Sequence, residues 1–69
     1  MADINKKVSA NIRKYRIKKG LSQEELGFEA ELHRAYIGQI ERGEKKIGLT
    51  NLEKIAKALE IKVSKLIED

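Results

Sequence analysis

The chain has 69 residues, which is enough for one small domain. It contains no cysteine, so disulfides, zinc–thiolate clusters and thiol nucleophiles are excluded. Fifteen Lys and Arg against eleven Asp and Glu give a net charge of +4, which fits either an ordinary solvated surface or attraction to phosphate.

The sequence favours helices throughout. There is no proline, and no useful stretch alternates apolar and polar residues as a half-buried strand does. No apolar run has membrane-spanning length, and M-A-D-I-N-K-K at the start is no signal peptide. We therefore expect a cytoplasmic, all-α protein in which residues 1–69 form one domain of five short helices.

The first predicted helix covers residues 4–19. Asp3 is suited to cap its N-terminus, and Gly20 is suited to end it in left-handed geometry. Its apolar residues recur at helical spacing and so share one face: Ile4, Val8, Ile12 and Tyr15.

Two short helices joined by a tight turn are predicted at 23–29 and 33–41. Ser22 and Glu25 have the spacing of a capping box at the start of the first. One apolar side of the pair should face the core: Leu26, Ala30, Leu32, Ile37 and Ile40. The second helix begins with a polar face that carries Arg34, which is how a helix-turn-helix presents side chains to the DNA major groove.

Two further helices are predicted at 49–59 and 63–67. The first should bury four residues: Leu52, Ile55, Ala56 and Leu59. The end of the chain holds more apolar residues than a five-residue helix needs for its own packing: Ile61, Val63, Leu66 and Ile67. These either close the core or form a two-fold dimer contact, and both roles together are compatible with the pattern.

Three segments, in this order and spacing, resemble the Cro/cI-type (XRE-like) helix-turn-helix family: R-I-K-K-G-L-S-Q-E-E-L at 16–26, L-H-R-A-Y-I-G-Q-I-E-R-G at 32–43 and L-E-K-I-A-K-A-L at 52–59. The resemblance covers residues 12–66, with the helix-turn-helix motif at 23–42, and implies a lambda-repressor-like fold. Within the family, the second segment is most similar to the small controller proteins of restriction–modification systems.

The resemblance implies two sets of DNA contacts. It places on the groove-facing side of the third helix, as base-reading residues, His33, Arg34, Ala35 and Gln39. It places near the phosphates Ser22, Gln23, Tyr36, Arg42, Lys45 and Lys46. The side-chain chemistry agrees, because Arg can fork onto guanine, Gln can pair with adenine, and a helix N-terminus favours a phosphate. The resemblance also implies an ion pair between Arg16 and Glu41.

Several of these residues have a second interpretation. Gln39 is also ordinary helix filler, and the ring of Tyr36 is equally suited to the edge of the core. His33 fits a cap of the third helix as well as a phosphate contact. Phe28 lies off the buried face and should be half exposed, covering Tyr36 or the first helix, with a partner contact as the alternative.

Three positions depart from the family pattern. Glu31 stands in the inter-helix turn and Glu60 follows the fourth helix, where the family often has glycine. Either Glu31 adopts a left-handed backbone, at a cost of about 1 kcal/mol, or the turn differs slightly from that of the family. Gly27 replaces a usual alanine, which weakens the second helix by up to about 1 kcal/mol.

We therefore predict a sequence-specific DNA-binding transcriptional regulator that binds a pseudo-palindromic operator as a homodimer, of the restriction–modification controller type. The alternatives are a phage-type repressor and an antitoxin-like regulator whose main role is to bind a protein partner. No catalytic carboxylate pair, activated nucleophile or metal-ligand set is present. We expect no enzyme activity, cofactor, metal, small-molecule ligand or membrane contact.

Overall fold

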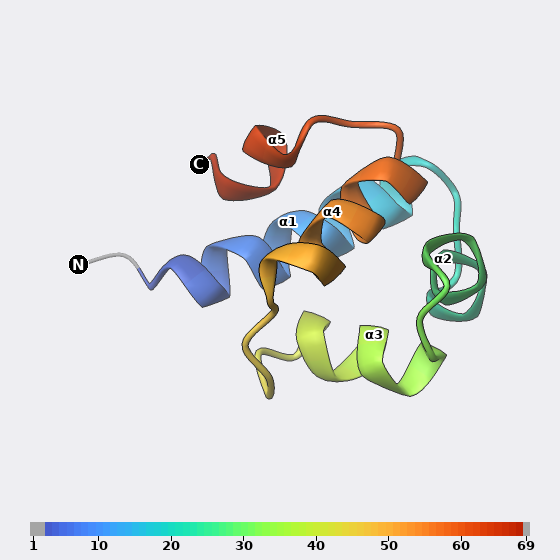
Figure 1. The fold of residues 1–69 in the computed structure, drawn as a ribbon, viewed down its shortest axis with the longest axis horizontal. Helices are drawn as coiled ribbons and strands as arrows, with labels where there is room; N and C mark the ends of the chain where they lie inside the picture. The colour runs from blue at the N-terminus through green and yellow to red at the C-terminus, as the bar shows by residue number, and fades with distance from the viewer. Residues whose placement is uncertain (1–2, 69) are drawn as a thin grey trace.

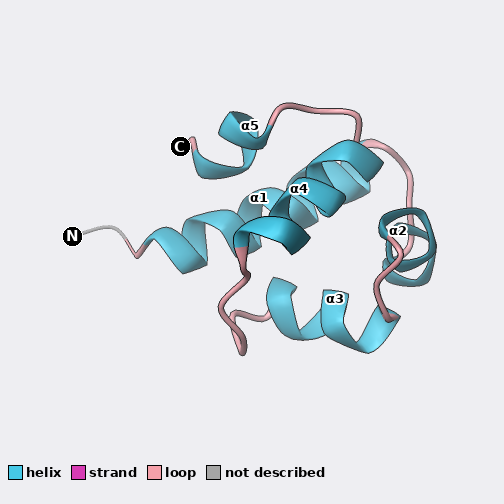
Figure 2. Ribbon diagram, viewed as in Figure 1, coloured by secondary structure: helices cyan, strands magenta, loops and turns pink. Residues whose placement is uncertain are grey.

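Five helices make up the part of the chain that the computed structural model describes, residues 3–68. They are α1 (Ile4–Lys18), α2 (Gln23–Ala30), α3 (Arg34–Glu41), α4 (Leu49–Ala58) and α5 (Val63–Ile67). Only loops and turns connect them, and residues 3–68 contain no strand (Figure 2). The predicted all-α fold is confirmed, with every helix boundary within one residue of its expected position.

The helices pack so that α3 lies along one edge of the molecule (Figure 1). α2 packs against both α3 and α4, and α1 packs against α3 and α5. α1 and α2 therefore hold α3 from behind, and its outer side is left uncovered.

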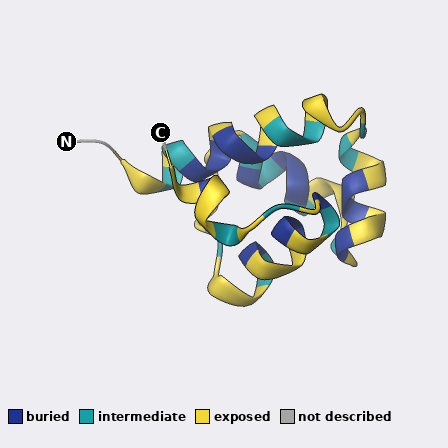
Figure 3. Ribbon diagram, turned by 90° about the horizontal axis from the view of Figure 1, so that it is seen from above, coloured by how far each residue is buried: buried dark blue, intermediate teal, exposed yellow. Residues whose placement is uncertain are grey.

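One apolar core fills the space between the helices. Its buried members come from all five helices and from the residue that follows α4: Val8, Ile12, Leu26, Ala30, Ile37, Ile40, Leu52, Ile55, Ala56, Leu59 and Leu66. Figure 3 shows buried and exposed positions alternating along the helices. Ile4 does not join the face on which it was predicted, because it lies in the first turn of α1 and is 57% exposed.

Four helices end with the same backbone turn. In each, a residue with positive φ follows the helix, and the next residue donates its N–H to a carbonyl five positions back. Two of these residues are glycines, but the other two are Glu31 (φ 58°) and Glu60 (φ 59°). The two glutamates thus keep the turn geometry that glycine favours, at a cost of roughly 1–2 kcal/mol each.

Gly27 is required by the close approach of α2 to the turn that follows it. A Cβ atom at this position would lie 2.6 Å from the carbonyl oxygen of Leu32 and 3.2 Å from the backbone nitrogen of Arg34. Both neighbours are backbone atoms, so neither can move without shifting the start of α3. The alanine that is usual in the family would therefore not fit this turn.

Phe28 is much more exposed than the half-exposed position predicted for it. Its relative exposure is 77%, so it covers neither Tyr36 nor α1 to any useful extent. The reason is its place on α2, since Leu26, Gly27 and Ala30 occupy the side of that helix that faces the core.

Candidate nucleic-acid interface

α3 has both buried and exposed residues. Ile37, Gly38 and Ile40 are buried, whereas Arg34 and Ala35, in its first turn, are exposed. Gln39 is half-buried and follows Ala35 by four positions, so the two lie next to each other on the helix surface. The structure thus leaves Arg34 and Ala35 accessible at the start of α3, and Gln39 partly accessible one turn further on.

His33 caps the start of α3, which is one of the two roles considered for it. Its Nδ1 atom accepts a hydrogen bond of 3.0 Å from the backbone N–H of Ala35. A neutral imidazole that accepts at Nδ1 carries its proton on Nε2. The exposed ring therefore has an N–H left to offer to a phosphate or a base edge.

Arg34 lies close to an acidic residue of α2. Its Nη1 atom is 3.5 Å from Oε2 of Glu24, and both side chains are largely exposed, at 65% and 73%. A contact this long between exposed groups contributes little to stability. Arg34 therefore remains available to a base, but it must leave Glu24 to reach one.

The start of α2 is held by the predicted capping box. The Ser22 hydroxyl oxygen accepts from the N–H of Glu25 at 3.0 Å, and the Glu25 carboxylate accepts from the N–H of Ser22 at 2.8 Å. In this cap the hydroxyl acts only as an acceptor. The hydroxyl proton of Ser22 is therefore not used in the cap.

Glu41 lies at the centre of a partly buried network that joins three helices. It accepts from Nε of Arg16 at 2.6 Å, from Nη2 of Arg16 at 3.0 Å and from the Gln23 amide at 3.1 Å. Arg16 also donates to the carbonyl of Leu21 at 2.8 Å. The side chains of Arg16 and Glu41 are only 12% and 3% exposed, so this pair fixes α1 and the start of α2 to the end of α3.

Gln23 and Arg42 meet over Gly38. A Cβ atom at Gly38 would lie 3.0 Å from Nη1 of Arg42 and 3.5 Å from Oε1 of Gln23. The absence of a side chain at Gly38 therefore lets two of the predicted phosphate contacts, from different helix ends, lie together at the C-terminal end of α3.

Arg42 also forms a fork with Glu44. Its Nε and Nη2 atoms donate to the carboxylate at 2.7 and 3.2 Å. These hydrogen bonds lower the pKa of Glu44, and the carboxylate in turn raises the pKa of Arg42. Lys45 and Lys46 follow in the same exposed loop. The loop is basic, but its arginine is already engaged by a carboxylate in the free protein.

Tyr36 takes the core-edge role considered for it, and its hydroxyl has a partner within the protein. Its ring is half-buried against the core, and its hydroxyl oxygen accepts from the Asn51 side-chain amide at 3.0 Å. Sequence reasoning missed Asn51, as it missed the contacts of Glu24 and Glu44. No periodicity or motif connects residues 36 and 51, because the fold alone brings the start of α4 within hydrogen-bond distance of Tyr36.

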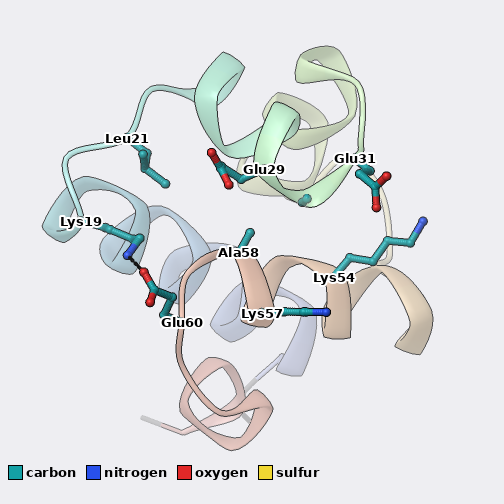
Figure 4. A pocket seen from close by; sticks show the side chains of 9 residues that line it. Lys19, Leu21, Glu29, Glu31, Lys54, Lys57, Ala58 and Glu60 are labelled. Carbon is teal, nitrogen blue, oxygen red and sulfur yellow. Dashed lines mark hydrogen bonds and ion pairs between the residues drawn. The ribbon is translucent and has the colours of Figure 1, made fainter.

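A hollow of about 510 Å³ lies away from these residues (Figure 4). Its rim carries both charges, including Glu29, Lys54 and Lys57, and the ion pair between Lys19 and Glu60 closes one side. None of the residues predicted to contact DNA lines it.

The predicted dimer residues separate into two groups. Leu66 is completely buried in the core, so it has no surface of its own to offer a partner. The reason is that its side of α5 packs onto α1, where Asn11 donates to the carbonyls of Leu66 and Glu68. Ile61 and Val63 are half-buried and Ile67 is 38% exposed, so these three keep accessible apolar surface.

Within residues 3–68, no helix is long and apolar enough to cross a bilayer. In the same part of the chain, no three His, Asp or Glu side chains are grouped as a metal ion would require.

Comparison with known proteins identifies the family. The sequence profile described as helix-turn-helix matches residues 12–66. The chain is 47% identical to the control protein C.BamHI of Bacillus amyloliquefaciens over 58 residues, which cover 83% of this chain and 72% of that protein. It is 45% identical to the control protein C.SmaI of Serratia marcescens over 65 residues, covering 94% and 77%.

Solved structures agree with the sequence comparison. The restriction–modification controller protein C.AhdI from Aeromonas hydrophila superimposes with a TM-score of 0.87 at 42% identity, over 90% of this chain and 94% of that one. The chain therefore belongs to the helix-turn-helix family of DNA-binding transcription regulators and is similar to restriction–modification controller proteins.

Proposed function

We propose that the chain is a controller-type regulator that binds an operator as a homodimer, with α3 of each protomer in successive major grooves. Such grooves are about 34–36 Å apart on one face of the duplex. The observation that carries the proposal is the uncovered side of α3. Arg34 and Ala35 are exposed at the start of this helix, and the basic 42–46 loop follows its C-terminal end.

Base reading is assigned to the first half of α3. Arg34 would fork onto O6 and N7 of guanine, with His33 beside it and Ala35 against a thymine methyl group. Gln39, one turn beyond Ala35, would pair with adenine. Each good pairing discriminates against a wrong base by about 1–3 kcal/mol.

Phosphate binding is assigned to the residues that gather at the other end of α3. Gln23 and Arg42 lie together over Gly38, and the exposed lysines of the loop extend the positive surface: Lys45 and Lys46. Ser22, next to Gln23, adds a free hydroxyl proton, and Tyr36 adds a phenol from the first turn of α3. These contacts carry no sequence information but fix the protein on the duplex.

Dimerisation is assigned to the accessible apolar residues at the end of the chain: Ile61, Val63 and Ile67. A single module of this kind covers only about 600–1,000 Å² of DNA-facing surface. A second copy doubles the number of bases that are read, which supports the dimer as the binding unit.

The controller role is supported by the relatives, which are named as control proteins. We propose that this chain likewise acts as a regulator rather than an enzyme, in the cytoplasm where its operator lies. The competing function, an antitoxin-like module that binds a protein, is compatible with the same fold but does not explain the basic residues of the 42–46 loop.

Selection of bound sites from a random DNA pool tests the proposal. The wild-type protein should enrich a two-fold symmetric site, and Arg34→Ala should lose the preference at specific positions. Lys46→Ala should instead lower the affinity for all DNA sequences alike. It should also reduce the slope of log affinity against log salt concentration by about one unit. A protein that enriches no sequence, and whose weak DNA affinity hardly depends on salt, would be a protein-binding module instead.

A further inference from the structure

A hydrogen bond joins the first turn of α3 to the first turn of α4. The Nδ2 atom of Asn51 donates to the hydroxyl oxygen of Tyr36 over 3.0 Å, and both side chains are half-buried. The Tyr36 ring packs against the core, so its position is set by packing and its hydroxyl by Asn51. Asn51 makes no base or phosphate contact in the assignment above.

The direction of this bond determines what Tyr36 can do. A phenol hydroxyl has one proton to donate and lone pairs that accept, whereas a phosphate oxygen in DNA only accepts. Because Asn51 supplies a donor, it occupies a lone pair of the Tyr36 oxygen and leaves the proton unused. A neighbour that accepted instead would take that proton and leave nothing for the phosphate.

We propose that Asn51 is a positioning residue for DNA binding, which holds the Tyr36 hydroxyl so that its proton is directed to a backbone phosphate. The proposal rests on the phosphate role proposed above for Tyr36. It predicts that Asn51 affects DNA affinity only through the Tyr36 hydroxyl, and that it affects all sequences alike because phosphates are the same at every step.

A double-mutant cycle tests this coupling. Dissociation constants are measured with the full-length protein on a random-sequence duplex and on a site selected from a random pool. Tyr36→Phe removes the hydroxyl and should lower the affinity for both duplexes by about three- to tenfold. Asn51→Ala should give a similar loss, because the hydroxyl is no longer oriented. In the Tyr36→Phe background, Asn51→Ala should cause no further loss.

Asn51→Asp reverses the bond and gives a second, independent readout. Its carboxylate accepts the Tyr36 proton and also repels phosphate, so it should weaken binding more than Asn51→Ala does. In the Tyr36→Phe background only the repulsion remains, and the loss caused by aspartate should be smaller than with tyrosine present. All measurements are made at a temperature where circular dichroism shows each variant folded.

The outcomes separate the possible failures. Asn51→Ala could lower the DNA affinity equally in the wild-type and Tyr36→Phe backgrounds. That result would show that Asn51 acts by itself or through stability, and would overturn the proposal. An unchanged affinity for Tyr36→Phe would remove the phosphate contact on which Asn51 is said to act, and the proposal with it. A wild-type protein that fails to bind either duplex would instead overturn the proposed function.

Discussion

Replacing Glu41 by alanine is expected to be the most destabilising single change in the network behind α3. The substitution removes the acceptor of three hydrogen bonds, two from Arg16 and one from Gln23. It leaves the Arg16 guanidinium, whose side chain is only 12% exposed, without a counter-charge. Breaking one partner of a buried pair costs about 3–5 kcal/mol. Since Arg16 keeps its bond to the Leu21 carbonyl, we expect about 3 kcal/mol.

This loss is large for a chain of 69 residues. At about 0.05–0.15 kcal/mol per residue, the total stability is only about 3–10 kcal/mol. In a domain of this size 1 kcal/mol moves the melting midpoint by about 4–8 °C, so Glu41→Ala should lower it by about 12–24 °C. Thermal unfolding followed by far-UV circular dichroism measures the shift directly.

Glu53→Ala is the matched control, because it removes an exposed glutamate from α4. Its midpoint should stay within a few degrees of wild type, since surface substitutions change stability by about 0.5 kcal/mol or less. Glu41→Gln keeps the shape and acceptor oxygen and should fall between the two. If Glu41→Ala melted together with Glu53→Ala, the argument that this carboxylate holds α1, α2 and α3 together would be wrong.

Three further predictions concern glutamates on the surface. Glu31→Gly should raise the melting midpoint by a few degrees, because relief of about 1–2 kcal/mol of left-handed strain exceeds the entropy cost of glycine, about 0.4–1 kcal/mol; a lower midpoint would show that the turn is not strained. Glu44→Gln should tighten binding to random-sequence duplex and steepen its salt dependence, because Arg42 no longer has a competing carboxylate; unchanged affinity would mean that Arg42 does not reach a phosphate. The bond from Lys19 lowers the pKa of Glu60 below its ordinary 4.5, so its contribution is present at neutral pH and is lost as the pH falls through that lowered value. The small gap in midpoint between wild type and Glu60→Gln should therefore close on acidification, and a gap that persisted in acid would exclude the ion pair as its cause.

The sequence alone predicted the helices because their signals are local. Capping residues, helical spacing of aliphatic side chains and the glycines after helices each act within a few residues. The same spacing predicted the core residues. Ile4 is the exception, because the first turn of a helix can extend beyond the helices that pack against it. The Glu31 turn was recognised as a departure, but only the backbone showed that it keeps the left-handed geometry.

Local sequence signals could not predict the side-chain contacts made by residues of the predicted interface. Asn51 lies 15 positions from Tyr36, and Glu24 lies 10 positions from Arg34, so neither pair has a periodic signature. The sequence also could not separate a core role from a dimer role for Leu66, because an apolar residue in a short helix suits both equally well. Its depth depends on how α5 folds back onto α1, which is a property of the whole packing.

The carboxylate that holds Arg42 in the free protein bears on how quickly an operator is found. A regulator that searches by sliding and hopping spends most of its time on sequences that are not its target. With Arg42 bound to a phosphate, as proposed, the arginine would exchange the Glu44 carboxylate for another anion on such DNA, and would gain less than an unengaged arginine. The protein should therefore leave each wrong position sooner, and the dwell time on the operator is left to the side chains that read bases.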